Sequence, residues 1–330
     1  MKVLIIGGTG HIGRYLVRHF VAEKAEVVVI ARGATAFGAP GAASGRADFW
    51  DKVRLIQLDR DIAEAKPVGD GRQTEWQVML SEIAAEVVID LVAFRVESTR
   101  QTIEAVRRHA SHFINIGTGW RFGETHTLPT REDDPPRPRS SYGEQKQAMW
   151  ELLRREFETN GLAGTQLDPP AIQGAPKVPN TPSGLRLLDV HQEIADGRRI
   201  QIPGTGETLL GMVHVADVAQ LVLLALAERD KAAGEAFNAT SDAGFTYNGL
   251  FYFLRELLGS QAEAEHLPLD EFERRYPQRT SRHHTLYHQL LSNEKAKRVL
   301  GFAPRNDLPE ILRENFWQLV KQGALRATLR

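Results

Sequence analysis

A glycine-rich turn at the start of the chain constrains its fold more than any other feature. The run Gly7-Gly8-Thr9-Gly10-His11-Ile12-Gly13 follows an apolar segment at Val3–Ile6 and opens an amphipathic segment at Ile12–Glu23. This strand–turn–helix context is the one that a dinucleotide-binding fingerprint requires. Glycines let backbone N–H groups approach a pyrophosphate, and the N-terminus of the helix adds a favourable field. The turn therefore predicts a dinucleotide site, with a glycine turn that binds no ligand as the plainer alternative.

The first 170 residues alternate short β-rich segments with amphipathic segments. Such alternation is typical of a parallel sheet that helices cover on both faces. We expect strands at Val3–Ile6, Glu26–Ile30, Val53–Leu58, Val87–Val92, Phe113–Ile116 and Thr165–Leu167, and helices at Ile12–Glu23, Gln73–Ala85, Glu97–His109 and Tyr142–Thr159. Gly33–Asp51 and Thr125–Ser140 are expected to be loops, the first of them mobile. The predicted fold class is α/β with a doubly wound parallel sheet.

The pattern changes after Pro169-Pro170 to longer irregular stretches with interspersed helices. We expect residues 1–170 to form a nucleotide-binding domain and residues 171–330 to form mainly a smaller substrate-binding lobe. Helices are predicted at Ala216–Glu228 and Tyr247–Leu258, and a short strand at Ala236–Ala239. Residues 212–240 are therefore expected to return to the sheet of the first domain.

Composition argues against several classes of function. The chain has 41 basic and 42 acidic residues, so its charge of -1 gives no overall attraction to nucleic acid or to an anionic membrane. The lack of cysteine excludes disulfides, thiolate zinc sites and cysteine nucleophiles. No apolar stretch reaches the length of a membrane span, and the first residues predict a strand and not a secretion signal. We therefore expect a cytoplasmic protein without a nucleic-acid or membrane partner.

The residues that follow the second expected strand favour NADP over NAD. An NAD enzyme usually carries an acid at this position, where it holds the ribose hydroxyls. This chain has Ala31 and then Arg32, and a guanidinium suits a 2′-phosphate. The alternative is that Arg32 is simply solvated beside the loop. Asp59, after the third strand, lies where an adenine amino group could be met, although it could equally be a turn residue.

Tyr142 and Lys146 form a candidate proton shuttle. They are four residues apart on a predicted helix, so the phenol and the ammonium lie on one face and can converge. A nearby ammonium favours the phenolate and lowers a tyrosine pKa that starts near about 10. The pair is therefore suited to moving a proton to or from an alcohol or a carbonyl.

The glycine turn and the Tyr142-x3-Lys146 pair together resemble the extended short-chain dehydrogenase/reductase superfamily, the NAD-dependent epimerase/dehydratase group. The resemblance covers nearly the whole chain. Further landmarks in the same order are Ile116–Gly123, Asp168–Gly174, Val213–Ala219, Phe237-Asn238-Ala239 and Lys297-x2-Leu300-Gly301-Phe302-x-Pro304. The resemblance implies a Rossmann fold and hydride exchange between a nicotinamide and a secondary alcohol or ketone of a sugar-like substrate.

The resemblance also implies a role for each reactive residue. Tyr142 would transfer the proton as general acid or base, and Lys146 would lower its pKa and hold a hydroxyl of the nicotinamide ribose. Thr118, counted back from Gly123, would hydrogen-bond the substrate oxygen. A reductase and an epimerase use the same set, so these residues do not separate the two reactions.

The remaining expected contacts surround this centre. Cofactor contacts are expected from Gly7, Thr9, Gly10, His11, Ile12, Gly13, Arg32, Asp59, Ala93 and Lys146, and substrate contacts from Thr118, Trp120 and Gln173. Trp120, Arg121 and Phe122 follow the threonine and could line the pocket, with Trp120 as its wall. The helix pair Glu97–His109 and Tyr142–Thr159 implies a homodimer, because the family builds a four-helix interface from it.

Two departures from the family concern the substrate. Gly119-Trp120 stands where sugar-nucleotide dehydratases place an acidic pair, so a 4,6-dehydratase is not expected. Leu210-Gly211-Met212 replaces the start of an Arg-Asp-Phe-Val-His-Val run, whose arginine clamps the substrate diphosphate in many nucleotide-sugar enzymes. A sugar nucleotide is therefore in doubt, although Lys177, Arg186, Arg198 or Arg199 could substitute.

A second class of function stays open. Ala31-Arg32-Gly33 and Asp59-Arg60-Asp61 are similar to the branch that contains chloroplast stem-loop RNA-binding proteins, which use this fold without an established redox role. An intact Thr118–Tyr142–Lys146 set and the balanced charge favour an enzyme. Three histidines, His283, His284 and His288, have metal-like spacing. No acid or third ligand with a convincing register accompanies their i, i+4 spacing, and Arg279 and Arg282 add positive charge, so no metal site is expected.

Overall fold

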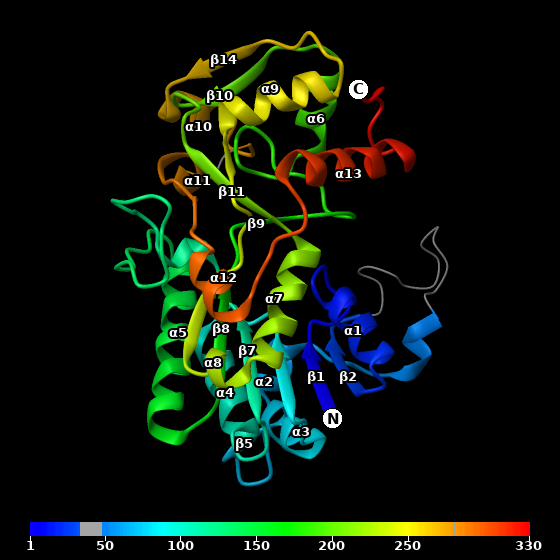
Figure 1. Cartoon of the computed structure of the whole chain (residues 1–330), viewed down its shortest axis with the longest axis vertical. Helices are drawn as coiled ribbons and strands as arrows, with labels where there is room; N and C mark the ends of the chain where they lie inside the picture. Colours follow the sequence, from blue (N-terminus) through cyan, green and yellow to red (C-terminus); the bar gives the residue numbers. More distant parts are fainter. Residues whose placement is uncertain (34–47, 280–281) are drawn as a thin grey trace.

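A seven-stranded parallel sheet, with helices packed around it, forms the lower part of the structure in Figure 1. The computed structural model describes residues 1–33, 48–279 and 282–330. The strand order is β12-β8-β7-β6-β1-β2-β3, and every neighbouring pair is parallel. The strands are β1 (Lys2–Ile6), β2 (Glu26–Ala31), β3 (Val53–Gln57), β6 (Val87–Asp90), β7 (His112–Ile116), β8 (Gly164–Asp168) and β12 (Glu235–Asn238). The six strands expected before Pro169 are confirmed, and so is the doubly wound α/β fold.

Apolar side chains fill both faces at the centre of this sheet, which explains why β1, β2 and β6 are nearly continuous hydrophobic runs. In β1, Val3 and Ile5 face one apolar cluster, whereas Leu4 and Ile6 face another. Helices α1 (Gly13–Ala22) and α7 (Val215–Ala227) cover the first face. The second face is covered by α3 (Glu75–Ile83), α4 (Val96–Val106) and α5 (Ser141–Asn160). Burial of each such Val, Leu or Ile side chain stabilises the fold by about 1.5–3 kcal/mol.

Local capping accounts for most differences from the expected boundaries. The helix expected at Gln73–Ala85 begins later, because Thr74 and Gln77 form a capping box. The preceding residues form β5 (Gln73–Thr74), which pairs with β4 (Pro67–Val68). An unexpected helix, α2 (Arg60–Ala65), follows Asp59, whose side chain accepts hydrogen bonds from two N–H groups of its first turn.

The segment expected to be a mobile loop, Gly33–Asp51, lies mostly outside the described residues. Its last part was predicted wrongly, because Asp48–Lys52 forms the 3-10 helix η1. The proline-rich segment at 125–140 contains neither a helix nor a strand, as expected. Within the described ranges, no helix combines the length and apolar character needed to cross a membrane.

A second group of elements lies above the parallel sheet in Figure 1. It contains a three-stranded sheet of β9 (Ala171–Gln173), β11 (Leu209–His214) and β13 (Gly244–Thr246), and a parallel pair of β10 (Ile200–Pro203) and β14 (Ala264–Leu267). Its helices are α6 (Leu188–Ala195), α9 (Tyr247–Leu257), α10 (Leu269–Arg275), α11 (Arg282–Leu286) and α13 (Leu308–Lys321). Several of these elements share an apolar core that is separate from the two cores of the large sheet.

The chain returns twice from this lobe to the large sheet. Helix α7, the short helix α8 (Arg229–Ala232) and β12 form the first return, and β12 pairs with β8. Helix α12 (Glu294–Leu300) forms the second return and packs against α7 and β12. A division of the chain into a nucleotide-binding domain and a lobe stays a proposal, and residues 294–302 belong structurally with the first.

Candidate active site

The glycine turn lies at the point where the strand order reverses between β1 and β6, which is where parallel α/β sheets bind their ligands. Gly7 adopts a φ of +83° and donates its N–H to Ile30 O at 2.8 Å. A Cβ on Gly13 would lie 2.5 Å from Gly8 Cα, so the first turn of α1 packs directly on the glycine turn. Helix α1 begins without a side-chain cap, and its positive end faces the turn. These features fit the pyrophosphate of a dinucleotide.

The other expected cofactor residues differ in how buried they are and in what they contact. Thr9 and His11 are buried, and His11 Nε2 lies 2.7 Å from Gly174 O, which ties the turn to the lobe. Arg32 is exposed at the end of β2. Asp59 is the N-cap of α2, with Oδ1 3.0 Å from Asp61 N. The structure therefore shows Asp59 in the alternative role, that of a turn residue. An adenine contact by Asp59 stays a prediction.

Lys146 joins the end of β7 to the segment that follows β6, beside the glycine turn. Its Nζ donates to Ala93 O at 2.7 Å and to Ile116 O at 2.6 Å, and the side chain is 2% exposed. Desolvation lowers the pKa of Lys146 to about 8, against the opposing attraction of nearby carboxylates. A Cβ on Gly7 would meet Val92, so the glycine turn packs against the segment that contains Ala93. Since Lys146 bonds Ala93 O, its ammonium lies close to the expected dinucleotide.

Tyr142 lies in the first turn of α5, where Ser140 caps the helix by accepting from Gly143 N at 3.2 Å. Desolvation raises the pKa of Tyr142, and its hydrogen bond with the Thr118 hydroxyl acts in the opposite direction. The expected lowering of the Tyr142 pKa by Lys146 was wrong for this arrangement. The Lys146 ammonium faces two carbonyl oxygens and is 5.8 Å from the centroid of the Tyr142 ring. The phenol therefore stays protonated at neutral pH and can donate.

Thr118 is held in place by a buried ion pair. Its N–H donates to Asp168 Oδ1 at 3.0 Å, and Arg121 Nε donates to Asp168 Oδ2 at 2.6 Å. Arg121 and Asp168 are 1% and 0% exposed, so the expectation that Arg121 could line a pocket was wrong. The Thr118 hydroxyl also accepts from Trp120 N at 3.3 Å, as a cap of the 3-10 helix η2 (Gly119–Arg121). The Thr118 hydroxyl thus caps η2 and also contacts Tyr142.

Trp120, in the loop that carries Thr118, forms an aromatic wall together with His283 and His284. The Trp120 ring stacks on His284, with centroids 4.6 Å apart, and meets His283 edge-on at 5.1 Å. Both histidines belong to α11 of the lobe, and burial lowers the pKa of His284 to about 4. The wall is therefore uncharged at neutral pH. In the described part of the chain, no group of three or more potential metal ligands is present.

Gln173 is bonded within the lobe. It is fully buried at the end of β9, and its Nε2 donates to Asn180 Oδ1 at 2.7 Å. Its Oε1 lies 3.5 Å from Arg186 Nη1. A substrate contact by Gln173 therefore stays a prediction.

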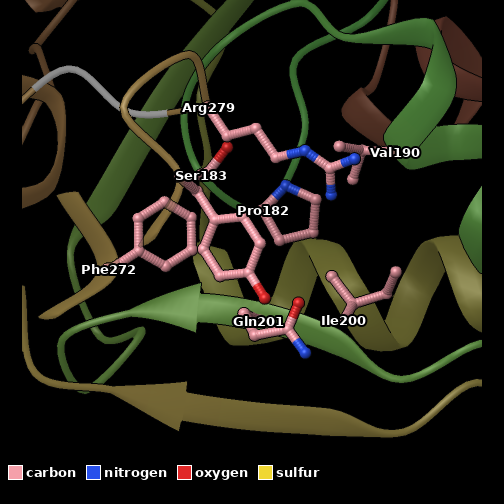
Figure 2. Close-up of a pocket in the computed structure, with 8 residues that line it drawn as sticks. Pro182, Ser183, Val190, Ile200, Gln201, Phe272 and Arg279 are labelled. Atoms are coloured by element: carbon pink, nitrogen blue, oxygen red, sulfur yellow. The ribbon is translucent and has the colours of Figure 1, made fainter. Parts of the chain in front are cut away.

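Figure 2 shows a cavity in the lobe that is too small to be the substrate site. Its volume is about 10 Å³. A space of this size holds at most a single water molecule. The cavity is lined by Pro182, Ser183, Val190, Ile200, Gln201, Phe272, Tyr276 and Arg279. None of these residues belongs to the reactive centre.

Thr118, Tyr142 and Lys146 thus meet at the carboxyl ends of β6 and β7, next to a glycine turn that fits a pyrophosphate. A doubly wound sheet with this arrangement at its switch point defines a Rossmann-type nucleotide-binding protein. Residues 3–240 match the family described as "NAD dependent epimerase/dehydratase family". The chain belongs to that family.

Individual relatives have different named activities. A chloroplast stem-loop binding protein of 41 kDa from Arabidopsis thaliana is 27% identical over 326 residues, which cover 96% of this chain and 78% of the relative. A dTDP-6-deoxy-L-talose 4-dehydrogenase (NAD(P)(+)) from Kitasatospora kifunensis is 27% identical over 329 residues, or 95% of this chain and 94% of the relative. The structure of UDP-glucose 4-epimerase from Thermotoga maritima matches with a TM-score of 0.73 at 23% identity, covering 98% of this chain and 99% of the other.

Proposed function

We propose that this protein is an NAD(P)-dependent oxidoreductase or epimerase that acts on a secondary alcohol or ketone of a sugar-like substrate. The convergence of Thr118, Tyr142 and Lys146 beside the glycine turn carries this proposal. Family membership and the named dehydrogenase and epimerase relatives support it.

In the proposed reaction, Tyr142 moves a proton at the substrate oxygen. Its phenol is neutral at pH 7, because its pKa is raised above the ordinary tyrosine value of about 10, and it donates to a ketone oxygen and accepts the proton back in the reverse direction. The Thr118 hydroxyl binds the same oxygen, and its hydrogen bond, which acts to lower the pKa of Tyr142, helps to stabilise the phenolate that proton transfer leaves behind. The nicotinamide supplies or accepts the hydride when bound. The glycine turn would hold its pyrophosphate, and Lys146 would hold its ribose.

A panel of sugars, sugar phosphates and sugar nucleotides tests this function. Nicotinamide absorbance and product stereochemistry should be followed with each compound. A net absorbance change would identify a reductase or dehydrogenase, whereas a changed stereocentre without net absorbance change would identify an epimerase. A chain that binds dinucleotide but converts no compound of the panel would contradict the proposal.

We also propose that NADP is preferred over NAD. Arg32 is exposed directly after β2, and the residue before it, Ala31, is not the acid that an NAD enzyme usually carries there. Arg32→Ala should weaken NADP⁺ binding by about 10- to 100-fold, the effect of losing a hydrogen bond to a charged group. NAD⁺ binding should not change, because NAD⁺ lacks the 2′-phosphate. Calorimetric titration measures both, with Arg54→Ala as the control at an exposed arginine on the neighbouring strand. An equal loss for both nucleotides would place Arg32 elsewhere in the site.

A homodimer through α4 and α5 is a further part of the proposal. The two helices pack against each other, and their exposed positions include Glu97, Arg100, Glu151 and Arg154. An interface made from such charges should weaken as salt screens them. Light scattering at low salt should give about twice the 36.8 kDa of one chain. A mass of one chain at every concentration and salt level would refute the dimer.

RNA binding is the second candidate function, which the stem-loop binding relative favours. An RNA-binding protein should show an association that weakens steeply with salt. Replacing Tyr142 with phenylalanine should leave that association intact, whereas an enzyme should lose turnover.

A further inference from the structure

A buried arginine, Arg60, joins α2 to the end of β6. Its Nε donates to Glu64 Oε1 at 2.5 Å, and its Nη1 donates to both carboxylate oxygens of Asp90, at 2.8 and 3.0 Å. Its Nη2 donates to Ser98 O at 2.8 Å and to Thr102 Oγ1 at 2.9 Å. A guanidinium has five N–H donors in a rigid fork. All five are therefore used, and the side chain is held in one orientation.

Asp90, the partner of this guanidinium, shapes the chain where it leaves β6. It is 0% exposed, and its Oδ1 also accepts the Val92 N–H at 3.1 Å. Val92 packs on the glycine turn, because a Cβ on Gly7 would lie 2.6 Å from Val92 Cγ1. The next residue, Ala93, accepts from Lys146 Nζ at 2.7 Å. The carboxylate therefore supports the segment that contacts both sides of the expected dinucleotide site.

The Arg60–Asp90 pair also lies beside the second hydrogen bond of Lys146. Asp90 of β6 is paired with Asn115 of β7. The residue after Asn115, Ile116, accepts from Lys146 Nζ at 2.6 Å. The Lys146 ammonium is thus bonded to the segment that follows Asp90 and to the residue that follows its partner in the sheet.

Charged groups on three neighbouring elements act on the Lys146 ammonium. Burial lowers the pKa of Lys146 to about 8. The negative charge of Asp90 opposes this shift most strongly, Asp168 of β8 opposes it less, and the positive charge of Arg60 adds to it. Tyr142, on the same helix as Lys146, adds no charge at pH 7, because its pKa is raised. The balance between Asp90 and Arg60 therefore affects whether Lys146 is charged.

We propose that Arg60 and Asp90 are positioning residues, which hold the segment after β6 against the glycine turn and keep Lys146 charged. This inference rests on the proposed function, in which Lys146 holds the nicotinamide ribose. Apolar residues of similar volume often stabilise a core as well as a buried ion pair does, so stability alone is a weak reason for this pair. Its hydrogen bonds to the segment beside Lys146 give it a role in the site.

NMR titration of the lysine side chains in the full chain measures the charge of Lys146 directly, with its signal identified by its loss in Lys146→Met. Asp90→Asn removes a negative charge and should move the midpoint from about 8 to lower pH. Arg60→Gln removes a positive charge and should move the midpoint to higher pH. Because the two expected shifts are opposite in sign, either variant decides the question if the other does not fold.

Glu64→Gln is the matched control. It removes a carboxylate from the same guanidinium, and in the described part of the chain Glu64 forms no hydrogen bond with residues 91–93. A purely structural pair would make Glu64→Gln and Asp90→Asn alike. We expect both variants to unfold at lower urea concentration than the wild type, but only Asp90→Asn to change the Lys146 midpoint.

Calorimetric titration with NAD⁺, from below to above pH 8, measures the consequence for the dinucleotide site. A charged Lys146 favours binding, so wild-type affinity should be full below the Lys146 pKa and fall as pH rises through about 8. In Asp90→Asn this fall should begin at lower pH. At pH 8 the variant should bind NAD⁺ about 5-fold more weakly, because losing a charged hydrogen bond costs about 10-fold or more and half of the wild type retains it.

Two results would overturn the positioning role. The Lys146 midpoint could be the same in the wild type, Asp90→Asn and Arg60→Gln, or Glu64→Gln could shift it as much as Asp90→Asn does. A wild type that binds neither NAD⁺ nor NADP⁺ would instead contradict the proposed function. The lysine titration needs no nucleotide, so it would still decide whether Arg60 and Asp90 set the charge of Lys146.

Discussion

Replacing Tyr142 with phenylalanine should reduce turnover by about 10²- to 10⁴-fold, the usual contribution of a positioned acid or base. The change removes only the hydroxyl that shares a hydrogen bond with Thr118. The ring and its neighbour Phe94, whose centroids are 6.3 Å apart, should keep their packing. Dinucleotide affinity should therefore persist while kcat falls.

Steady-state kinetics and nucleotide titration of the same preparation give this comparison. Tyr252→Phe is the matched control, because Tyr252 lies on α9 and is 57% exposed. It should retain full turnover. Unchanged kcat in Tyr142→Phe would remove Tyr142 from the chemistry and, with it, the proposed mechanism.

Replacing Arg121 with methionine should destabilise the fold by about 3–5 kcal/mol, since it leaves a buried carboxylate without its partner. Methionine keeps much of the side-chain volume, so the loss reflects the charge of Asp168, which is 0% exposed. Asp168 also accepts the Thr118 N–H at 3.0 Å, so a displaced carboxylate should shift Thr118 and lower turnover as well.

Urea unfolding measures this effect, with Arg199→Met as the matched control. Arg199 pairs with Glu263 at 2.9 Å, with side chains 62% and 69% exposed. Exposed pairs of this kind contribute about 0–1 kcal/mol. Equal unfolding midpoints for the two variants would show that the Arg121–Asp168 pair does not hold this part of the site.

The centre of the sheet could be predicted because β1, β2 and β6 are short apolar runs bounded by glycine or polar residues. Val3–Ile6 and Val87–Asp90 are examples, and each is buried on both faces. Thr118, Tyr142 and Lys146 could be found because their spacing and order form a recognisable pattern. The local sequence pattern was sufficient to predict these strands and these three residues.

The Arg121–Asp168 pair could not be predicted in the same way. Its members are 47 positions apart, and arginine is rarely buried, so no local pattern places Arg121 in the core. The orientation of Lys146 was also missed, because it depends on carbonyl oxygens of two segments that are distant in the sequence, Ala93 after β6 and Ile116 at the end of β7. The sequence pattern did not predict that His283 and His284 pack on Trp120. Their contact with Trp120 joins distant segments of the chain.

The central claim is that a nicotinamide dinucleotide binds between the glycine turn and Lys146. Mass spectrometry tests it on nucleotide released by denaturing the desalted protein, after incubation with equal concentrations of NAD⁺ and NADP⁺. We predict that the folded chain retains a nicotinamide dinucleotide, with NADP in excess over NAD. A correctly folded chain that releases neither nucleotide would contradict the account.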